Sequence, residues 1–336
     1  MTGRIVCFGE LLLRLAAPGR ELLLQSGRLD VHVGGAEANV ATALARLGHE
    51  TGMVSRVPDN ALGDAAAGHL RRYGVDTAGV STGPGRMGLY FLAPGAGVRP
   101  SDIVYDREGS SFALAGPDDF DWDALLDGAD LLHLSGVTPA LGRASADAAL
   151  AAAEAARARG IQVSFDGNYR AQLWRRRDGD PAAILRALVG TADILFGNHR
   201  DLSLLLDRDF GGSGEPRRRE AAEAAFAAFP QLKLIASTAR HVIDAGTHRI
   251  AARIDGRDGA AQTEELVVAG IVERIGAGDA FAAGVLHGMR RGLDLGGSVH
   301  AGLALTCLKH SLPGDASLFG ARDIEAFLAG ERDIRR

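Results

Sequence analysis

The run Gly276-Ala277-Gly278-Asp279 is the part of the sequence whose residue types and spacing best fit a chemical role. Small residues let a backbone approach a ligand closely. The alanine-rich stretch that follows predicts a helix, whose first N–H groups and positive dipole end would bind an anion. In phosphoryl transfer a carboxylate accepts the proton of the attacking hydroxyl while N–H groups hold the migrating group. Asp279 would be that carboxylate, kept ionised by the helix dipole, although an aspartate that only caps a helix fits equally well.

Three further segments place polar groups where a predicted strand or turn leads into a helix. Gly34-Gly35-Ala36-Glu37-Ala38-Asn39 opens a predicted helix, with Glu37 and Asn39 as polar groups at the start of an otherwise apolar pattern. Asp166–Arg170 lies at the end of the predicted strand 161–166, where ligands gather in open α/β sheets. Asn198–Asp201 follows the predicted strand 193–197. A plain turn also explains the first segment, and an N-capped helix start is the favoured interpretation of the third.

A repeated strand–helix pattern supplies the elements that must position these residues. Strands are predicted for 4–9, 52–57, 130–135, 161–166, 193–197 and 232–237. Helices are predicted for 36–47, 60–73, 143–159, 199–206, 216–228, 277–291, 296–309 and 321–329. This alternation predicts an α/β fold, a three-layer α/β/α sandwich around a mainly parallel central sheet. Residues 241–268 look like antiparallel strands on its edge.

Two β-like segments, 11–33 and 86–115, interrupt this pattern. We expect them to form a small β-sheet lid over the strand ends, while residues 1–10, 34–85 and 116–336 form the core that binds nucleotide and substrate. A small sheet with one exposed apolar face is unstable alone, so we expect a homodimer that pairs two lids.

The composition excludes several other classes of protein. The net charge is −5 and the charges are interspersed, so we expect neither a nucleic-acid partner nor a membrane partner. No transmembrane run and no signal-peptide pattern is present, so we expect a cytoplasmic protein. The two lysines, Lys233 and Lys309, do not follow a glycine, which excludes a Walker A loop. The two cysteines, Cys7 and Cys307, lie in apolar runs and are expected to be buried thiols.

These motifs together resemble those of the ribokinase-like (PfkB) carbohydrate kinases, over about residues 4 to 330. Within the family the chain is most similar to the 2-keto-3-deoxygluconate kinases. The segments that carry this closer resemblance are Gly34–Glu37, Gly88–Tyr90, Tyr105–Arg107, His133–Gly136, Asp166–Arg170 with Leu173 and Trp174, and Leu308–Asp315. The resemblance implies a ribokinase-like fold and ATP-dependent phosphorylation of 2-keto-3-deoxy-D-gluconate at its C6 hydroxyl.

The resemblance also implies a role for each candidate site residue. Asp279 would be the catalytic base, beside an anion hole made by the N–H groups of Gly276, Ala277 and Gly278. The sugar acid would be bound by Gly34, Gly35, Ala36, Asn39, Tyr90, Tyr105, Arg107 and Arg170. The nucleotide side would contain Asn168, Asn198, Ser237, Gly276 and Gly278. Mg²⁺ would bridge the ATP phosphates, with Asn198 and Asp201 helping through water, and a monovalent cation is a further candidate cofactor.

The chemistry of the acid sugar supports this assignment separately, because arginine is the natural bidentate partner of a carboxylate. A ribose or fructose pocket needs no such arginine. Arg107 and Arg170 are the two candidates, although a surface arginine or an ion pair would also explain each of them.

The chain departs from the family pattern in three places. Glu273-Arg274-Ile275 stands where the family usually begins Asp-Thr, Asp201 stands where a glutamate is usual, and Ser237–Arg240 replaces a glycine-rich turn. Because of these changes, the sequence does not fix which residues bind the phosphates, the adenine and the metal ions. The alternatives are another sugar kinase of fructokinase or ribokinase type, or a non-catalytic sugar-binding relative, against which the intact Gly276–Asp279 loop argues.

Overall fold

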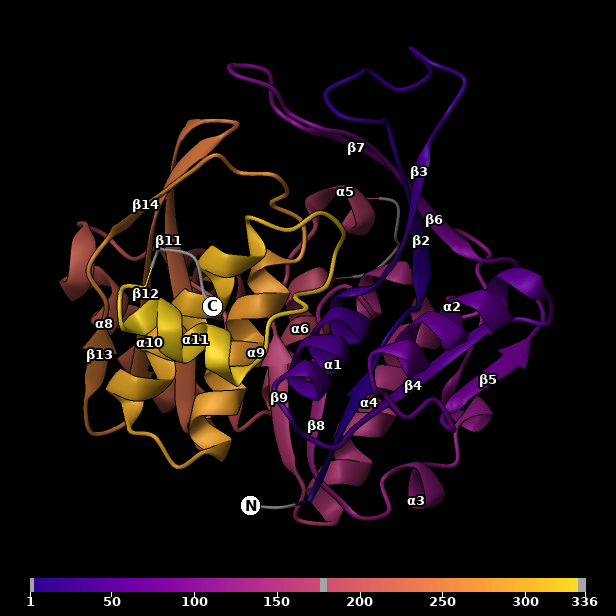
Figure 1. The fold of residues 1–336 in the computed structure, drawn as a ribbon. Helices are drawn as coiled ribbons and strands as arrows, with labels where there is room; N and C mark the ends of the chain where they lie inside the picture. Colours follow the sequence, from indigo (N-terminus) through magenta and orange to yellow (C-terminus); the bar gives the residue numbers. More distant parts are fainter. Residues whose placement is uncertain (1–2, 176–179, 332–336) are drawn as a thin grey trace.

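The computed structural model describes residues 3–175 and 180–331, and within them ten strands form one large sheet (Figure 1). Residues 1–2, 176–179 and 332–336 of the predicted core segments lie outside the described residues. The strand order is β13-β12-β11-β10-β9-β8-β1-β4-β5, and β14 also pairs with β12. The strands from β11 to β5 are parallel, while β12, β13 and β14 are antiparallel to their partners. The predicted parallel sheet with an antiparallel edge is therefore confirmed.

On its parallel side the sheet contains every predicted strand and one strand, β5, that was not predicted. The bounds of the strands in the whole sheet are β1 Arg4–Phe8, β4 Thr51–Pro58, β5 Val80–Gly83, β8 Ala129–Ser135, β9 Gln162–Asp166, β10 Ile194–Phe196, β11 Leu234–Asp244, β12 Thr247–Gly256, β13 Ala260–Gln262 and β14 Leu266–Ala269. The main difference is β11, predicted to end at 237. It continues to Asp244 because β12 pairs with it along almost its whole length.

Strand β1 shows why helices cover both faces of the sheet. Successive side chains of a strand point to opposite faces, and here Ile5 and Cys7 join one buried cluster while Val6 and Phe8 join another. Both thiols, Cys7 and Cys307, are buried and free, as predicted. The two clusters make the three layers that the sequence predicts.

The helices divide between these two clusters. The first is covered by α1 Ala36–Arg46, α2 Ala61–Arg72, α9 Ala277–Arg290, α10 Leu295–Lys309 and α11 Ala321–Leu328. The second is covered by α3 Trp122–Leu125, α4 Arg143–Ala158, α5 Ala171–Trp174, α6 Pro181–Val189, α7 His199–Leu206 and α8 Gly214–Ala228. Helices α3, α5 and α6 were not predicted, although Asp180 caps α6 and Pro181 begins it, a recognisable start signal.

Helix α9 packs tightly on α10, and this contact fixes the segment that carries the candidate base. A side-chain carbon at Gly284 would lie 2.7 Å from the carbonyl oxygen of Ala301 and 2.8 Å from the Cα of Gly302. A carbon at Gly302 would similarly lie 2.7 Å from Val285. The two helices can approach so closely only because these positions lack side chains.

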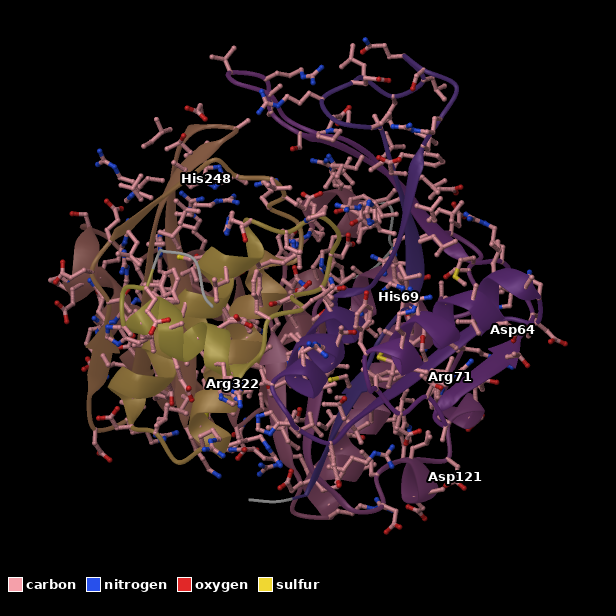
Figure 2. The ribbon with its side chains drawn as sticks, in the orientation of Figure 1. Asp64, His69, Arg71, Asp121, His248 and Arg322 are labelled. Carbon is pink, nitrogen blue, oxygen red and sulfur yellow. The ribbon has the colours of Figure 1, made fainter. Side chains whose placement is uncertain are left out.

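Four strands form a second sheet in the order β3-β2-β6-β7, separate from the main sheet (Figure 1). Their bounds are β2 Leu12–Ala16, β3 Asp30–Gly34, β6 Gly88–Ala93 and β7 Asp102–Asp106. One face buries Leu12, Ala16, Tyr90 and Leu92, and Ile275 packs against this cluster. The small sheet therefore lies against the loop that precedes Gly276. No helix among the described residues is long and apolar enough to cross a membrane, and polar side chains are spread around the molecule (Figure 2).

Candidate active site

Gly276 is the residue that shapes the start of α9. It has a φ of 76°, in the left-handed region that only glycine adopts without strain. A side-chain carbon at this position would overlap the backbone carbonyl of Asp315. The loop between β14 and α9 can pack on the Asp315 segment only with glycine here.

The backbone amides of this loop form a site for an anion. Within the described residues the N–H groups of Gly276, Gly278 and Asp279 have no acceptor, and the space beside Gly278 is open. Ala277, predicted to contribute as well, instead donates to the carbonyl of Arg274 (3.3 Å). The free amides lie at the positive end of a 14-residue helix, where negative charge is stabilised.

Asp279 lies in the first turn of α9, and Asn39 of α1 donates a hydrogen bond to its carboxylate (Nδ2 to Oδ2, 2.7 Å). Burial raises the pKa of Asp279 to about 7, although the hydrogen bond from Asn39 and the charge of Arg170 both oppose this rise. The sequence predicted that the helix dipole would keep this carboxylate ionised, and that direction is wrong. Burial outweighs the hydrogen bond from Asn39 and the charge of Arg170, and the result is a base that titrates near neutral pH.

Arg170 lies near three carboxylates, one at the end of β9 and two in the first turns of α7 and α9. Its positive charge lowers the pKa values of Asp166, Asp201 and Asp279, against the larger effect of burial, which raises all three. Burial and the negative charge of Asp279 bring the pKa of Asp166 to about 8. Asp166 ends β9, as predicted for a ligand site at the carboxyl edge of the sheet.

Arg240 lies close enough to Arg170 and to Arg274 for their charges to interact. Partial burial and the positive charges of Arg274 and Arg170 lower the pKa of Arg240. Within residues 3–175 and 180–331, none of the three guanidinium groups has a carboxylate or hydrogen-bond partner. Guanidinium groups with free donors in one region favour an anionic ligand there.

The loop before Gly276 is organised by Glu273. Its Oε1 accepts hydrogen bonds from the N–H groups of Arg274 (2.9 Å) and Ile275 (3.0 Å). Its Oε2 accepts a hydrogen bond from Nη1 of Arg14 in β2 (2.6 Å). Glu273, which stands where the family usually has aspartate, therefore fixes the loop and ties it to the small sheet.

Asp315 ties the same sheet to the other side of the loop. It forms an ion pair with Arg14 (3.0 Å) and accepts a hydrogen bond from the hydroxyl of Tyr90 (2.7 Å). Arg14 and Asp315 are almost completely buried. Tyr90, predicted to bind substrate, thus uses its hydroxyl within the protein, and Tyr105 lies beside it with ring centroids 6.3 Å apart.

The early glycine turn lies next to Asp315 and Glu10. A side chain at Gly34 would overlap the carboxylate of Asp315, and one at Gly35, whose φ is 138°, would overlap the carbonyl of Glu10. Ala36 then begins α1, which places Asn39 one turn later against Asp279. The turn therefore brings two predicted site segments, 240 residues apart, into contact.

Glu37, the other polar residue at the start of α1, is buried under this turn. Its Oε1 accepts hydrogen bonds from the N–H (3.0 Å) and hydroxyl (2.7 Å) of Ser135 and from the hydroxyl of Thr138 (3.1 Å). Burial raises its pKa, against the effect of these hydrogen bonds. Glu37 thus fastens α1 to the end of β8.

Arg107 is buried, and its Nε donates to the carboxylate of Glu10, which also accepts from the hydroxyl of Ser110. The sequence left open that Arg107 forms an ion pair instead of binding a ligand. The structure shows such an ion pair for its Nε atom. Within the described residues both Nη groups of Arg107 have no partner. Glu10 orients this arginine and leaves two of its donor groups available for a ligand.

The other residues predicted to bind nucleotide and metal lie in a helix cap, in the loop after β9 and in strand β11. Asn198 and Asp201 cap α7 reciprocally: Asn198 accepts from the N–H of Arg200 (2.9 Å), and Asp201 accepts from the N–H of Asn198 (2.7 Å). This confirms the N-capped helix start. Asn168 has a φ of 36° and donates its N–H to Asp166 (3.0 Å), while Ser237 lies in β11 without a side-chain hydrogen bond among the described residues.

No group of three or more histidine, cysteine, aspartate or glutamate side chains that could hold a metal ion occurs in the described part of the chain. A metal ion here would take most of its ligands from phosphate oxygens and water, which is the usual behaviour of Mg²⁺.

Several of these residues were not predicted from the sequence. They are Glu10, Arg14, Arg240, Arg274, Lys309 and Asp315. Arg14 lies in the apolar strand Leu12–Ala16, and a charged residue in a buried strand is a signal that could have identified it. The ion pairs themselves join segments far apart in the chain, and no local pattern shows them.

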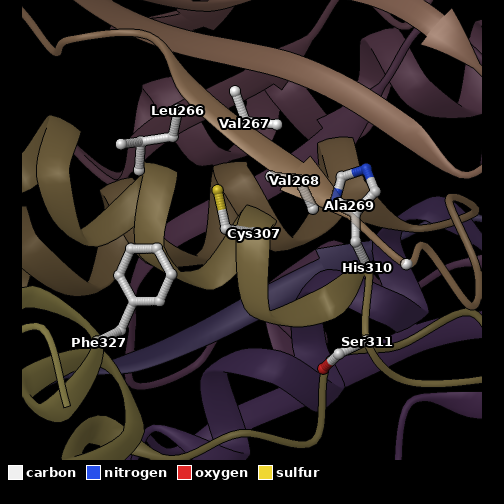
Figure 3. Close-up of a pocket in the computed structure, with 9 residues that line it drawn as sticks. Leu266, Val267, Val268, Ala269, Cys307, His310, Ser311 and Phe327 are labelled. Carbon is white, nitrogen blue, oxygen red and sulfur yellow. The ribbon is translucent and has the colours of Figure 1, made fainter. Parts of the chain in front are cut away.

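A hollow of about 440 Å³ lies on the other side of the last turn of α10 (Figure 3). It is bounded by β14, by Phe327 of α11 and by Cys307, His310 and Ser311. None of the predicted site residues lines it.

Comparison with known proteins places the chain beside sugar kinases. The family model described as pfkB family carbohydrate kinase matches residues 2–318. A 2-dehydro-3-deoxygalactonokinase of Haloferax volcanii is 29% identical over 98% of both chains. The crystal structure of 2-dehydro-3-deoxygluconokinase from Thermotoga maritima is 36% identical, with a TM-score of 0.92 over 98% of this chain and 100% of that one. A fructokinase from Xylella fastidiosa with bound ATP is 22% identical (TM-score 0.79, covering 99% of this chain and 100% of that one) and shares the fold.

The hydrogen bond from Asn39 gives a testable pH dependence for the phosphorylation expected from the sequence. The base must be unprotonated, so kcat/KM should rise with pH through about 7 as Asp279 loses its proton. Asn39→Ala removes a bond that stabilises the carboxylate and should move this rise upward by about one to two pH units, since a hydrogen bond to a charged group contributes about 1.5–3 kcal/mol.

The control is Asn60→Ala, which removes the side-chain cap of α2. It should leave the pH profile where it is in the unmodified protein. An Asn39→Ala profile that coincides with that of the unmodified protein would show that Asp279 is not the titrating base.

Proposed function

Because the chain belongs to the pfkB family of carbohydrate kinases, we propose that it transfers the γ-phosphoryl group of ATP to the C6 hydroxyl of 2-keto-3-deoxy-D-gluconate. The products would be 2-keto-3-deoxy-6-phosphogluconate and ADP. One observation carries the proposal: the Asp279 carboxylate, with a pKa near 7, lies beside free amides at a helix start and near three unpaired arginines. This arrangement suits a nucleophilic hydroxyl and two anionic reactants.

In the proposed reaction the C6 oxygen attacks the γ-phosphorus while the bond to the β–γ bridging oxygen breaks. Asp279 accepts the hydroxyl proton, and the ADP oxygen keeps the electron pair of the broken bond. The transition state is loose, so positioning and charge neutralisation supply most of the rate enhancement. The amides of Gly276, Gly278 and Asp279 would receive the migrating phosphoryl group.

We place the ATP phosphates against Arg240 and Arg274, which lie near the glycine loop and have no protein partner among the described residues. Mg²⁺ held beside the phosphates would neutralise part of their charge. Asn198 and Asp201 remain candidates to hold the ion through water. Asn168, Asn198 and Ser237 remain candidates for the nucleotide side.

We place the sugar acid between the early glycine turn and the small sheet. Arg107 offers two free Nη groups, and Arg170 offers an exposed guanidinium near Asp279. Either could bind the carboxylate bidentately. Tyr105, Gly34, Gly35 and Ala36 would line the space between them. The small sheet, formed within segments 11–34 and 86–115, would then act as a lid that excludes water from the reaction.

The names of the relatives favour an acid sugar without fixing which one. They include a 2-dehydro-3-deoxygluconokinase and a 2-dehydro-3-deoxygalactonokinase, whose named sugar acids differ in the configuration at one hydroxyl. Fructokinase and ribokinase substrates lack a carboxylate, so they would offer no anionic group to the free Nη groups of Arg107 or to the guanidinium of Arg170. Charged donors whose hydrogen bonds are left unmade in a closed site are costly, which disfavours those substrates.

A substrate panel with an ADP-release assay tests the proposal. 2-Keto-3-deoxygluconate and its galactonate epimer should be turned over with kcat/KM about 10- to 150-fold above fructose and ribose, because a charge-assisted bidentate pair contributes about 1.5–3 kcal/mol. Arg170→Met should shrink this preference about 10- to 100-fold, whereas Arg240→Met should raise KM for ATP and leave the preference intact.

The matched control is Arg322→Met, which alters an exposed arginine of α11 (Figure 2). It should change neither the preference nor KM for ATP. Equal or better turnover of fructose or ribose by the unmodified protein would contradict the acid-sugar assignment, and a protein that turns over no member of the panel would support a non-catalytic relative.

We further propose that two copies pair through the outer faces of their small sheets. Val31, Leu15, Phe91 and Val104 form an apolar row across β3, β2, β6 and β7, because each is the cross-strand partner of the next. Val31 is 60% and Val104 is 47% exposed in the single chain. A continuous apolar row on a lid of four strands is a typical self-complementary interface.

Light scattering of the purified protein should give twice the 35.0 kDa mass of one chain. Val104→Asp puts like charges into the paired faces and should give the single-chain mass. Val98→Asp, at a fully exposed position in the β6–β7 connection, is the control and should leave the mass unchanged. An unmodified protein with the mass of one chain would contradict pairing through the lid.

A further inference from the structure

Lys309 is a completely buried lysine to which the proposed function assigns no role. It is one of two lysines in the chain, it ends α10, and 0% of its surface is exposed. Its ammonium donates one hydrogen bond, to the backbone carbonyl of Leu312 (3.0 Å), and forms no ion pair within the described residues. An ammonium has three donors and its burial is costly. A leucine or methionine would fill this space at lower cost, so the charge calls for an explanation.

The last turn of α10 lies directly behind the glycine loop. The hydroxyl of Thr306 donates to the carbonyl of Ala277 (3.1 Å). The carbonyl of His310 accepts from the N–H groups of Val272 (2.8 Å) and Glu273 (3.2 Å). The residues on both sides of Lys309 therefore hold the chain just before and just after Gly276.

The ammonium belongs to the buried charge cluster that organises this loop. Burial lowers the pKa of Lys309 to about 8, while the negative charges of Glu273, Asp315 and Asp279 oppose that shift. Arg14 is the other cation close enough to affect it. Lys309 and Arg14 thus balance Glu273 and Asp315. Without the lysine this cluster would carry one net negative charge, immediately behind the amides proposed to receive a phosphoryl group.

Lys309 cannot act by touching a ligand. It has no exposed surface, and it is absent from the lining of the hollow beside α10, which the neighbouring Cys307, His310 and Ser311 do line (Figure 3). Any effect on an anion at Gly276–Asp279 must pass through the loop as a fixed positive charge. Such a charge in a region of low dielectric acts strongly and needs no reorganisation during the reaction.

We propose that the Lys309 ammonium is a built-in monovalent cation, which neutralises the cluster behind the glycine loop and makes phosphoryl transfer independent of added potassium or other monovalent ions. This inference rests on the proposed kinase function and deepens it. Lys309 is a positioning residue in this account, because it acts through the loop that holds the anion. The monovalent cofactor left as a candidate by the sequence is then supplied by the chain itself.

The test replaces potassium chloride by choline chloride at constant ionic strength. The unmodified protein should keep its kcat and its calorimetric affinity for Mg·ADP within about twofold. Lys309→Ala should lower both about 10- to 100-fold in choline chloride. Potassium or ammonium ions, which can enter the space left by the side chain, should restore a large part of the loss, and choline, which is too large, should not.

Two further variants separate electrostatics from packing. Lys309→Met fills the space without charge and should show the same loss with no restoration by small cations. Lys233→Met removes the other lysine, which pairs with Asp193 (2.9 Å) away from the loop, and should behave as the unmodified protein. If Lys309→Ala does not fold, the kcat and the Mg·ADP affinity of Lys309→Met, compared with those of the unmodified protein, still test whether the charge is needed.

Three outcomes would overturn the proposal. They are a loss of activity by the unmodified protein in choline chloride, full kcat and full nucleotide affinity in Lys309→Met, and a loss in Lys309→Ala that is equal in potassium and choline. The kinetic arm uses whichever sugar the unmodified protein phosphorylates, and the nucleotide-binding arm needs no sugar. Failure of the acid-sugar assignment is therefore distinguishable from failure of this inference.

Discussion

The buried ion pairs that join Arg14 to Glu273 and Asp315 are the interaction on which the rest of the site depends. Glu273 holds the amides of the loop before Gly276, and the carbonyl of Asp315 packs where Gly276 has no side chain. Arg14 comes from the small sheet, so these contacts set the position of that sheet and of the glycine loop together. The chemistry proposed for Asp279 requires this frame, because the free amides point to one place only while the loop is fixed.

Burying these charges costs free energy, which explains why each charged side chain has an oppositely charged neighbour. A charge that is buried without its partner destabilises a protein by about 3–5 kcal/mol. When every buried charge has a partner, the net contribution of the pairs to the free energy of unfolding is close to zero. Tyr90 donates a hydrogen bond to Asp315, and the backbone N–H groups of the loop donate to Glu273. These hydrogen bonds and the two ion pairs of Arg14 hold the frame together. The same burial that makes it costly also raises the pKa of Asp279 to about 7, so a catalytic base and a stable frame arise from one cause.

The sequence predicted those parts of the site that depend on local patterns. The glycine turn at Gly34 and the start of α9 were identified because small residues before an alanine-rich run indicate a helix N-terminus. The parallel core followed from alternating strands and helices. The sequence could not show the contact between Asn39 and Asp279 or the pairing of Arg107 with Glu10, because the partners lie far apart in the chain. It also gave the wrong direction for the pKa of Asp279, since burial depends on the whole fold and not on the helix that carries the residue.

The central claim is that Asp279 is the base for phosphoryl transfer, and a comparison of Asp279→Asn with the unmodified protein tests it most directly. The amide keeps the size of the side chain but cannot accept the proton, so kcat should fall about 10²- to 10⁴-fold. Calorimetric affinity for the sugar acid should stay within a few fold, and Asp64→Asn on the outer side of α2 (Figure 2) should match the unmodified protein in both measurements. An Asp279→Asn protein with unchanged kcat would contradict the claim.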